Sequence, residues 1–563
     1  MDQTTFAKLA HLGEQLEQTR SRLELAALLA DFLRALAPEE IAVAVRMIIG
    51  QVFPEWDGRT LNVSWRQVEA VLAELTDASP AVQAEVAGQA VDGGEKVRLL
   101  LERARRRPPE APPLTILEVF HIFEAMAQTA GRGSQARKEA LVRELLGRMA
   151  AVEAKFVVKL IYQEMRHGVS EGIMLEGIAK AAGAKIGPVR RANQLWGDLG
   201  EVARVALLEG ETALKQASLR LFQPLKPMLA QTSEDLGEVF QRYQGQVALE
   251  YKLDGARVQI HRQGERVQIY SRQLSDVTDS LPDVVERVRA GLAAQEAILD
   301  AEAVAVDAEG RPLPFQHLMR RFRRKHDLAA NVAEIPVEIY LFDLLHVDGQ
   351  TLIDAPYQAR WTALERAAGE IKLAPRLLPK SVEEAQAFAQ AADEAGHEGV
   401  MAKDVESRYT PGVRGKTWLK LKHFISLDLV IVAADWGYGR RHGWLSNYHL
   451  AARDAESGDY LVVGKTFKGL TDAEFDQMTR RLLALEQSRR GATVFVQPQV
   501  VVEVLFNEIQ ESRQYRSGLA LRFARIFRLR EDKAPGEADT LQMLRELYER
   551  QFQAKGAAPG FRR

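Results

Sequence analysis

The spacing of apolar residues changes part-way along this chain of 563 residues, and that change constrains the fold more than any other feature. In residues 23–33 and 116–123, apolar side chains recur at the intervals of a helix with one buried face. After Pro224 and Pro227, segments with the alternation of strands take over. The sequence therefore predicts an all-α N-terminal region followed by domains that are rich in β-strands.

The order of these patterns predicts several domains with turn-rich connections. A proline-rich stretch at 108–113 interrupts the helical region as a stiff linker, and residues 556–563 are expected to be a loose tail. The expected domains are residues 1–220, 221–424 and 425–563. The last of them has short predicted strands that suit a five-stranded OB barrel, at 427–434, 448–453, 460–467, 500–507 and 521–529.

The composition bears on the compartment and on the metals that the chain can hold. There is no run of about 18 apolar residues, and the N-terminus, with Asp2, Glu14 and Glu17, lacks the pattern of a signal peptide. We therefore expect a cytoplasmic protein that does not span a membrane. Because the chain has no cysteine, disulfides and thiolate zinc sites are excluded.

The formal net charge is −2 at pH 7, so any affinity for nucleic acid must come from basic residues that gather locally. Candidate patches are residues 320–325, the loop 436–444 with Arg440 and Arg441, and the last strand. Arginines interleaved with aromatic residues fit contacts to sugar, phosphate and base. Each patch is equally compatible with an ordinary solvated surface.

Lys252 lies between a predicted strand and a glycine turn, in the segment Glu250-Tyr-Lys-Leu-Asp-Gly-Ala-Arg257. The arrangement suits a lysine that acts as a covalent nucleophile. An amine with a pKa of ~10.4 is almost fully protonated at neutral pH, so attack on phosphorus needs nearby cations or desolvation to lower that pKa. We expect Arg257 and a bound metal to supply the charge. The alternative is an exposed lysine before an Asp-Gly turn.

Residues 256–262 and 266–272 alternate polar and apolar side chains around Gly264, a pattern that predicts a β-hairpin. Antiparallel pairing about that turn brings Arg272 back beside Arg257, near the strand that ends at Lys252. Three cations would then converge. A solvated arginine on an edge strand is the alternative for Arg272.

Carboxylates and an aromatic residue lie on the strands that follow. In residues 298–306, Asp300 and Glu302 share a face with apolar residues, so each carboxylate needs a partner. Phe342 lies in a buried strand, where plain core packing is the alternative. Glu398 comes later, and Mg²⁺ suits one or two such carboxylates together with phosphate oxygens.

The segment Trp418-Leu-Lys-Leu-Lys422 predicts a strand whose two lysines share a face. Trp418, Lys420 and Lys422 lie on that face and the leucines on the other. Two ammonium groups therefore point the same way. An amphipathic edge strand is the alternative.

These elements, in this order, resemble the motifs of ATP-dependent DNA ligases, which belong to the covalent nucleotidyltransferases. Segment 165–169 also resembles the L-R-x-G-V signature of their helical DNA-binding domain, and we expect a helix to end at Gly168, where the chain and Arg166 can contact a phosphate. The other matches are P-M-L-A at 227–230, K-x-D-G-x-R at 252–257, L-D-G-E at 299–302 with Ala301 in place of the glycine, E-G-V-M-x-K at 398–403, W-L-K-x-K at 418–422 and R-x-D-K at 530–533. The resemblance implies an all-α DNA-binding domain, an α+β adenylation domain with antiparallel sheets, and a C-terminal OB-fold β-barrel.

The resemblance also implies roles for individual residues. Lys252 would take AMP from ATP through a P–N bond, Asp254 would act in the final sealing step, and Arg272 would hold the 5′-phosphate of a nick. Mg²⁺, or Mn²⁺ in its place, would bind Glu302 and Glu398. The residues that would contact the nucleotide are Glu250, Arg257, Arg272, Glu302, Phe342, Lys420 and Lys422. Arg530 and Lys533 would contact the departing pyrophosphate. The residues that would contact DNA are Arg166, Gly168, Arg272, Arg440 and Arg441.

The implied function is the sealing of nicks in double-stranded DNA through lysyl-AMP and DNA-adenylate, by a monomer. ATP is the expected donor, because NAD-dependent DNA ligases usually carry a four-cysteine zinc finger and this chain has no cysteine. A hinge near residues 422–428 would let the OB domain face first the active site and then the DNA. Two alternatives stay open: an RNA ligase or capping-type nucleotidyltransferase, and a nick-binding scaffold without catalysis.

Overall fold

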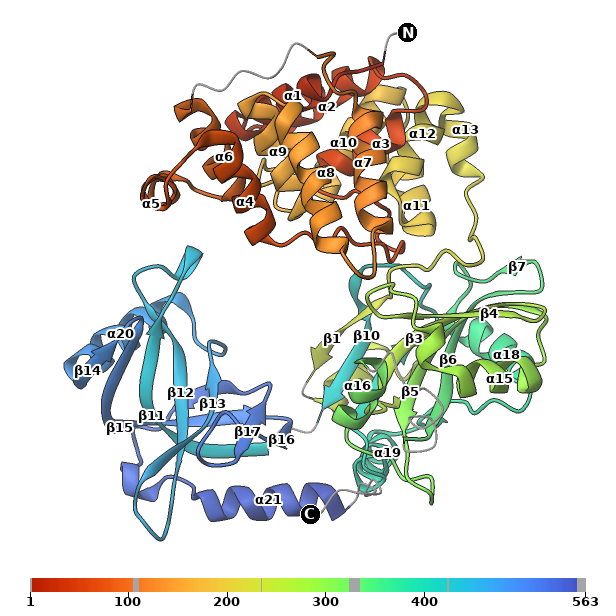
Figure 1. Cartoon of the computed structure of the whole chain (residues 1–563). Helices are drawn as coiled ribbons and strands as arrows, with labels where there is room; N and C mark the ends of the chain where they lie inside the picture. Colours follow the sequence, from red (N-terminus) through yellow and green to blue (C-terminus); the bar gives the residue numbers. More distant parts are fainter. Residues whose placement is uncertain (1–2, 105–110, 234, 324–334, 423–424, 554–563) are drawn as a thin grey trace.

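The computed structural model describes residues 3–104, 111–233, 235–323, 335–422 and 425–553. Figure 1 shows a helical N-terminal part at the top, a central part with the first strands, and a strand-rich C-terminal part in blue. Large clusters of buried apolar side chains lie in each part. The predicted fold class is confirmed.

The N-terminal part is built from helices alone among the described residues up to 220. A capping box starts α7 where the predicted helical spacing begins, because Thr115 Oγ1 accepts from Glu118 N at 3.2 Å and the Glu118 carboxylate accepts from Thr115 N at 2.8 Å. The helices are α1 Phe6–Gln18, α2 Arg22–Arg34, α3 Ile41–Ile48, α4 Trp65–Thr76, α5 Pro80–Gln89, α6 Gly93–Arg103, α7 Ile116–Gln128, α8 Ser134–Arg148, α9 Ala151–Ile161, α10 Glu171–Ala182, α11 Ile186–Trp196, α12 Leu199–Leu208 and α13 Gly210–Lys215.

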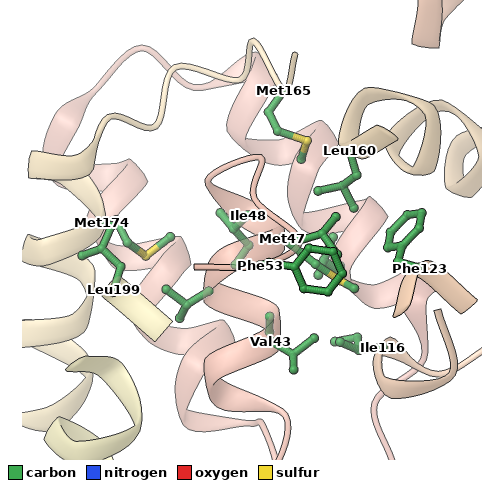
Figure 2. Packing of buried hydrophobic residues seen from close by; sticks show 14 of the residues in the cluster. Val43, Met47, Ile48, Phe53, Ile116, Phe123, Leu160, Met165, Met174 and Leu199 are labelled. Atoms are coloured by element: carbon green, nitrogen blue, oxygen red, sulfur yellow. The ribbon is translucent and has the colours of Figure 1, made fainter. Parts of the chain in front are cut away.

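Side chains from several of these helices meet in one core. Figure 2 shows Met47 of α3, Phe123 of α7 and Leu160 of α9 packed near Phe53. The predicted segments 23–33 and 116–123 lie in α2 and α7, where Leu25, Leu29, Leu33, Val119 and Phe123 are buried and Leu23 is exposed. Part of the proline-rich linker, 108–110, lies outside the described residues.

The prediction of a helix end at Gly168 is wrong. Helix α9 already ends at Ile161, and the chain then takes positive φ angles at Gln163 (57°), Arg166 (52°) and Gly168 (80°). A left-handed residue cannot continue a right-handed helix, so this segment is a connection to α10. His167 fixes it to the core, since its Nε2 lies 2.7 Å from a backbone carbonyl of α3 and its ring is buried.

Two sheets form the central part, with strand orders β1-β10-β9-β2-β8 and β4-β3-β5-β6-β7. Helices α14 and α19 cover one face of the first sheet, through a cluster that includes Leu249, Ala402 and Leu419. Helices α15 and α18 pack on the second sheet. The elements are β1 Leu229–Ser233, α14 Leu236–Arg242, β2 Val247–Tyr251, β3 Ala256–Gln263, β4 Arg266–Ser271, η1 Thr278–Ser280, α15 Pro282–Gly291, β5 Glu296–Ala305, α16 Phe315–Arg323, β6 Val337–Val347, β7 Gln350–Thr351, α18 Tyr357–Ala367, β8 Arg376–Leu377, α19 Val382–Glu394, β9 Gly399–Asp404 and β10 Arg414–Lys422.

The predicted hairpin forms from β3 and β4. Its turn contains Gly264, whose φ of 57° suits glycine. Val258 pairs with Ser271, which places the backbone of Arg272 next to that of Arg257, as the antiparallel register predicts.

Hydrogen bonds hold the segment before and around Pro224 and Pro227 against β3. Phe222 N donates to His261 Nδ1 at 2.8 Å, and Leu225 N donates to Gln259 Oε1 at 2.8 Å. Both acceptor side chains are buried. The chain that leaves the helical part is thus bound to the second sheet, while the domain limits at 220 and 424 stay predictions.

His261 predicts that acid destabilises the central part. Burial, with the charge of His346 acting in the same direction, lowers the pKa of His261 to about 3. Below a pH of ~6.5 the unfolded chain therefore binds a proton on this imidazole, whereas the folded chain does not. Each pH unit down to about 3 lowers the free energy of unfolding by about 1.4 kcal/mol. We expect the midpoint temperature of unfolding to decrease when the pH is lowered from 7 to 5. In His261→Gln this decrease should be smaller. Equal pH slopes in calorimetry would contradict this.

The C-terminal part is a curled half-barrel of strands with two packed helices. The first four expected strands match parts of β11, β12, β13 and β15, with 460–467 and 500–507 each one residue too long, but the prediction of one last strand at 521–529 is wrong. Phe523 has a φ of 59°, which ends β17, and β18 then pairs with β15 instead. The elements are β11 Ile425–Trp436, η2 Gly439–Arg441, β12 Leu445–Arg453, β13 Tyr460–Thr466, α20 Asp472–Ala484, β14 Glu486–Arg490, β15 Thr493–Phe506, β16 Glu508–Glu511, β17 Leu519–Arg522, β18 Arg525–Leu529, η3 Pro535–Glu537 and α21 Leu541–Gln553.

Two sequence predictions fall on chain that the structure does not describe. The tail at 556–563 and residues 423–424 of the expected hinge lie outside the described residues. In the described part of the chain, no helix combines the length and the apolar character that crossing a membrane requires.

Candidate active site

Lys252 follows β2 directly, and backbone hydrogen bonds hold it against the start of β9. Its N–H donates to Gly399 O at 2.8 Å, and its carbonyl accepts from Glu398 N at 2.9 Å. The two side chains also meet, with Lys252 Nζ 2.7 Å from Glu398 Oε2 and both about a fifth exposed (23% and 22%). The fold thus brings together two residues that are far apart in the sequence.

Gly255 allows the loop after Lys252 to lie against the second sheet. A Cβ atom on Gly255 would stand 2.3 Å from the carbonyl oxygen of Ala303 and 3.0 Å from the Glu302 side chain. Both neighbours belong to β5, whose backbone is fixed by strands on either side. Only glycine therefore fits here without moving the loop.

We expect Gly255→Ala to lower the rate of AMP transfer about 100-fold, because the shifted loop displaces Lys252 by a fraction of an ångström or more. The overall fold should survive, since the loop is not part of a large core. Single-turnover labelling with ATP measures the rate and circular dichroism the fold. Gly58→Ala, where nothing lies within 4 Å of the added Cβ atom, is the control. Wild-type labelling by Gly255→Ala would contradict the prediction.

One face of the first sheet presents polar residues toward the second sheet. Met401 of β9 pairs with Glu250 of β2 on one side and with Lys420 of β10 on the other, so these three side chains share a face. Trp418 lies two residues before Lys420 and is therefore on the same face, as the strand period predicts. The side chain of Lys422 lies outside the described residues.

Lys403 lies at the centre of this face and was given no role from the sequence. Its Nζ is 2.7 Å from Glu250 Oε2 and 3.1 Å from the carbonyl oxygen of Phe342, and its side chain is 1% exposed. Glu250 also accepts a hydrogen bond from the hydroxyl of Tyr357. Burial lowers the pKa of Lys403, although Glu250 acts in the opposite direction. The sequence signal was a lysine inside the E-G-V-M-x-K segment.

Arg257 projects from the facing sheet and is committed to an acid. Its backbone pairs with that of Glu302, but its guanidinium lies 2.6 Å from Asp300 Oδ2 and donates to Met228 O at 2.6 Å. Tyr409 completes the group, since its hydroxyl donates to Asp300 at 2.6 Å. Asp300 was predicted to need a partner and has two. Tyr409 was missed, because nothing in its local sequence indicates that contact.

Phe342 stands at an irregularity of β6. Ala301 pairs with Leu341 and Asp300 with Asp343, so Phe342 is the extra residue of a β-bulge. A bulge re-aims a side chain relative to the regular pleat. The ring of Phe342 lies 4.8 Å from Lys403 Nζ and 5.3 Å from the Arg257 guanidinium carbon, between cations of the two sheets.

The expected depression of the Lys252 pKa is wrong for the chain by itself. Burial lowers that pKa, but Glu398 and Glu302 outweigh burial and raise it above the ordinary value. Arg257, which was expected to supply positive charge, is neutralised by Asp300. The amine is therefore held as an ammonium ion by the carboxylates.

Glu302 is half-buried, and its pKa is raised to about 7. Burial is the largest cause, Lys252 and Arg257 oppose it, and the charges of Glu398 and Asp254 raise it further. A cluster of acids that share one cation is short of positive charge. A divalent cation would supply the missing positive charge.

The donor set fits a magnesium ion that keeps water and substrate oxygens. In the described residues no group of three or more His, Cys, Asp or Glu side chains is arranged around one point. Mg²⁺ is commonly held by one or two carboxylates together with phosphates, and Glu302 and Glu398 both act electrostatically on Lys252. These residues therefore fit the metal only in the presence of a phosphate ligand.

Arg272 is exposed, one residue beyond the end of β4, with its backbone next to that of Arg257. Other predicted site residues lie in the C-terminal part. Arg530 and Lys533 contact Asp428 within the C-terminal part. Arg440 is 84% exposed and pairs with Asp472, and Arg441 donates to a backbone carbonyl while its guanidinium lies near two phenylalanine rings.

The basic run 320–325 is not a continuous surface patch. Arg321 is 2% exposed, pairs with Asp283, and donates to the carbonyl of Ile335 at 2.9 Å. It is a structural residue of the core beneath the second sheet. Residues 324–325 lie outside the described residues.

Comparison with known proteins gives consistent matches along the chain. Family models match residues 5–179 (DNA ligase N terminus), 227–422 (ATP dependent DNA ligase domain) and 441–533 (ATP dependent DNA ligase C terminal region). DNA ligase 1 of Korarchaeum cryptofilum is 45% identical over 97% of this chain and 98% of its own, and DNA ligase of Thermococcus onnurineus is 41% identical over 99% and 100%. The chain belongs to the ATP-dependent DNA ligases.

The fold of the ligase has a counterpart among solved structures. A structure titled Pmar-Lig_PreS3 matches with a TM-score of 0.55 and 18% identity, covering 93% of this chain and 99% of that one. Membership of the family makes the protein an enzyme that uses ATP and acts on DNA, with Mg²⁺ as the usual metal. An RNA ligase, a capping enzyme and a non-catalytic scaffold are not favoured.

Proposed function

We propose that this ligase seals nicks in duplex DNA as a monomer in the cytoplasm, with Lys252 as its nucleophile. The observation that carries the proposal is the position of Lys252 at the junction of two facing sheets, 2.7 Å from Glu398 and within the field of Glu302. A lysine that served only to neutralise two acids would not need the cations Arg257 and Lys403 and the β-bulge residue Phe342 around it.

In the first step, Lys252 Nζ loses a proton to water and attacks the α-phosphorus of ATP. The P–N bond forms as the P–O bond to pyrophosphate breaks. Lys252 must first leave its ion pair with Glu398. A metal bound by Glu302 and Glu398 would supply positive charge that lowers the pKa of the amine and offsets the charge of the phosphates.

The nucleotide would lie between the two sheets. The ring of Phe342 would stack on the base. Glu250, held in place by Lys403, would accept a hydrogen bond from the nucleotide, and Glu302 would accept one from the ribose. Lys420, Lys422 and Arg257 are the proposed partners of the phosphates, and Arg530 and Lys533 those of the departing pyrophosphate. Positioning and electrostatics supply most of the catalysis in such a reaction.

In the later steps, AMP passes to a 5′-phosphate, and the 3′-hydroxyl then displaces AMP. We assign the 5′-phosphate to Arg272, whose exposure leaves it open to a large substrate, and a part in the last step to the buried Asp254. We propose that Arg166, Gly168, Arg440 and Arg441 contact the sugar-phosphate backbone of DNA. The exposed side chains of Arg166 and Arg440 suit such contacts.

The test is mass spectrometry of the protein after incubation with ATP and Mg²⁺. We expect one AMP on the peptide that contains Lys252, no adduct with GTP in place of ATP, and joining of nicked duplex DNA but not of nicked RNA. An AMP group on another residue would overturn the assignment of the nucleophile. Light scattering of the protein in solution tests the monomer.

A further inference from the structure

Asp428 holds two cations of the C-terminal part against a single oxygen atom. Its Oδ2 lies 2.7 Å from Arg530 Nη1 and 2.5 Å from Lys533 Nζ, and its side chain is 7% exposed. These are the two cations that we assign to pyrophosphate. Neither the sequence motifs nor the proposed function gives Asp428 a role.

The carboxylate is fixed to the barrel rather than carried on a loop. Asp428 belongs to β11, its N–H donates to Asp539 Oδ2 at 2.7 Å, and its carbonyl accepts from Asp539 N at 2.8 Å. The backbone N–H of Arg530 is bonded to Val501 O of β15 at 2.9 Å. The acid and its two cations therefore belong to one rigid unit, in whichever direction the C-terminal part faces.

The remaining contacts show what Asp428 adds. Asp532 holds Arg530 from the other side, with its two oxygens 2.9 Å and 2.7 Å from Nε and Nη2. Arg530 would therefore keep a partner without Asp428. Lys533 would lose its ion-pair partner, and the two like charges, now without a carboxylate between them, would repel each other.

We propose that Asp428 is a positioning residue for the adenylation of Lys252, which keeps Arg530 and Lys533 side by side so that both can hold the pyrophosphate that leaves. The inference rests on the proposed function. Asp428 touches no substrate, and it acts through the two cations. Sealing of a nick whose 5′ end already carries AMP releases no pyrophosphate, so that reaction does not need the arrangement.

The test compares the two reactions in full-length Asp428→Asn, a change that keeps the shape of the side chain and removes its charge. We expect AMP transfer from ATP to slow about 10- to 100-fold, and sealing of a pre-adenylated nick to change less than about threefold. The concentration of pyrophosphate that removes AMP from the adenylated protein should rise about tenfold. A merely structural role would not shift that concentration.

The matched control is Asp476→Asn, which breaks the exposed ion pair of Asp476 with Arg480 on α20 at 2.7 Å and should leave every rate unchanged. Asp428→Glu keeps the charge and should lose less activity than Asp428→Asn. Equal losses in both reactions by a folded Asp428→Asn, or no loss in either, would overturn the proposal. If that variant does not fold, Asp428→Ser, which also removes the charge, is assayed in its place, and an unchanged pyrophosphate requirement in Asp428→Ser overturns the proposal.

Failure of the underlying function gives a different result. Arg530→Ala and Lys533→Ala should each slow AMP transfer and raise the pyrophosphate requirement. If neither does, the assignment of these cations is wrong. If both do and Asp428→Asn behaves like the wild type, only the role of Asp428 is wrong.

Discussion

Lys252→Ala is expected to abolish transfer of AMP from ATP to the protein and to lower ATP-dependent joining of nicked DNA by about 10⁴-fold or more. The side chain is the only protein group in the proposed scheme that forms a bond to phosphorus, so no neighbouring residue replaces it. Labelled ATP followed by denaturing electrophoresis measures the first effect, and a nick-joining assay the second. Lys380→Ala, at an exposed lysine outside the site, is the matched control.

A nick that already carries AMP separates chemistry from folding in the same variant. Lys252→Ala should still join that substrate, at a rate reduced by about 10- to 100-fold, because Glu302 and Glu398 remain. Joining at that level shows that the variant is folded. Persistent labelling of Lys252→Ala by ATP would contradict the assignment.

Glu398→Gln should slow AMP transfer about 100- to 1000-fold and raise the Mg²⁺ concentration needed for half-maximal rate. Two effects oppose each other here. Loss of the carboxylate 2.7 Å from Nζ removes a cause of the raised Lys252 pKa and so favours the free amine. Loss of a metal ligand weakens charge compensation on the phosphates, and we expect this larger effect to dominate.

The rate as a function of Mg²⁺ concentration distinguishes the two effects of Glu398→Gln. Faster labelling at neutral pH, or an unchanged Mg²⁺ requirement, would show that Glu398 acts on the lysine alone. Glu406→Gln, at an exposed acid that follows β9, should match the wild type in both respects.

The hairpin and the lysine strand show why much of the site could be predicted. Antiparallel pairing and a period of two fix which side chains share a face, so the neighbourhood of Arg257 and Arg272, and the common face of Trp418 and Lys420, follow from the sequence. The charge state of Lys252 could not be predicted this way. It depends on Glu302 and Glu398, which lie at other places in the chain, and on Asp300, which neutralises Arg257.

The helix end before Gly168 and the last barrel strand mark another limit. In both places a residue other than glycine, Arg166 or Phe523, adopts a positive φ that its side chain does not favour. In both places the next residue is held by a distant part of the chain, His167 by the carbonyl of Ile48 and Ala524 by the hydroxyl of Thr466. A pattern that is read along the chain has no access to such contacts.

The sequence by itself determined the fold class, the order of the domains, the family and the two acids that act on Lys252, Glu302 and Glu398, because periodicity and motif spacing are properties of the chain alone. The tertiary structure decided how the charges are paired: Lys252 with Glu398, Arg257 with Asp300, Lys403 with Glu250, and Arg530 and Lys533 with Asp428. Ion pairing depends on distance and burial, and for these pairs both are set only when strands far apart in the chain come to lie side by side.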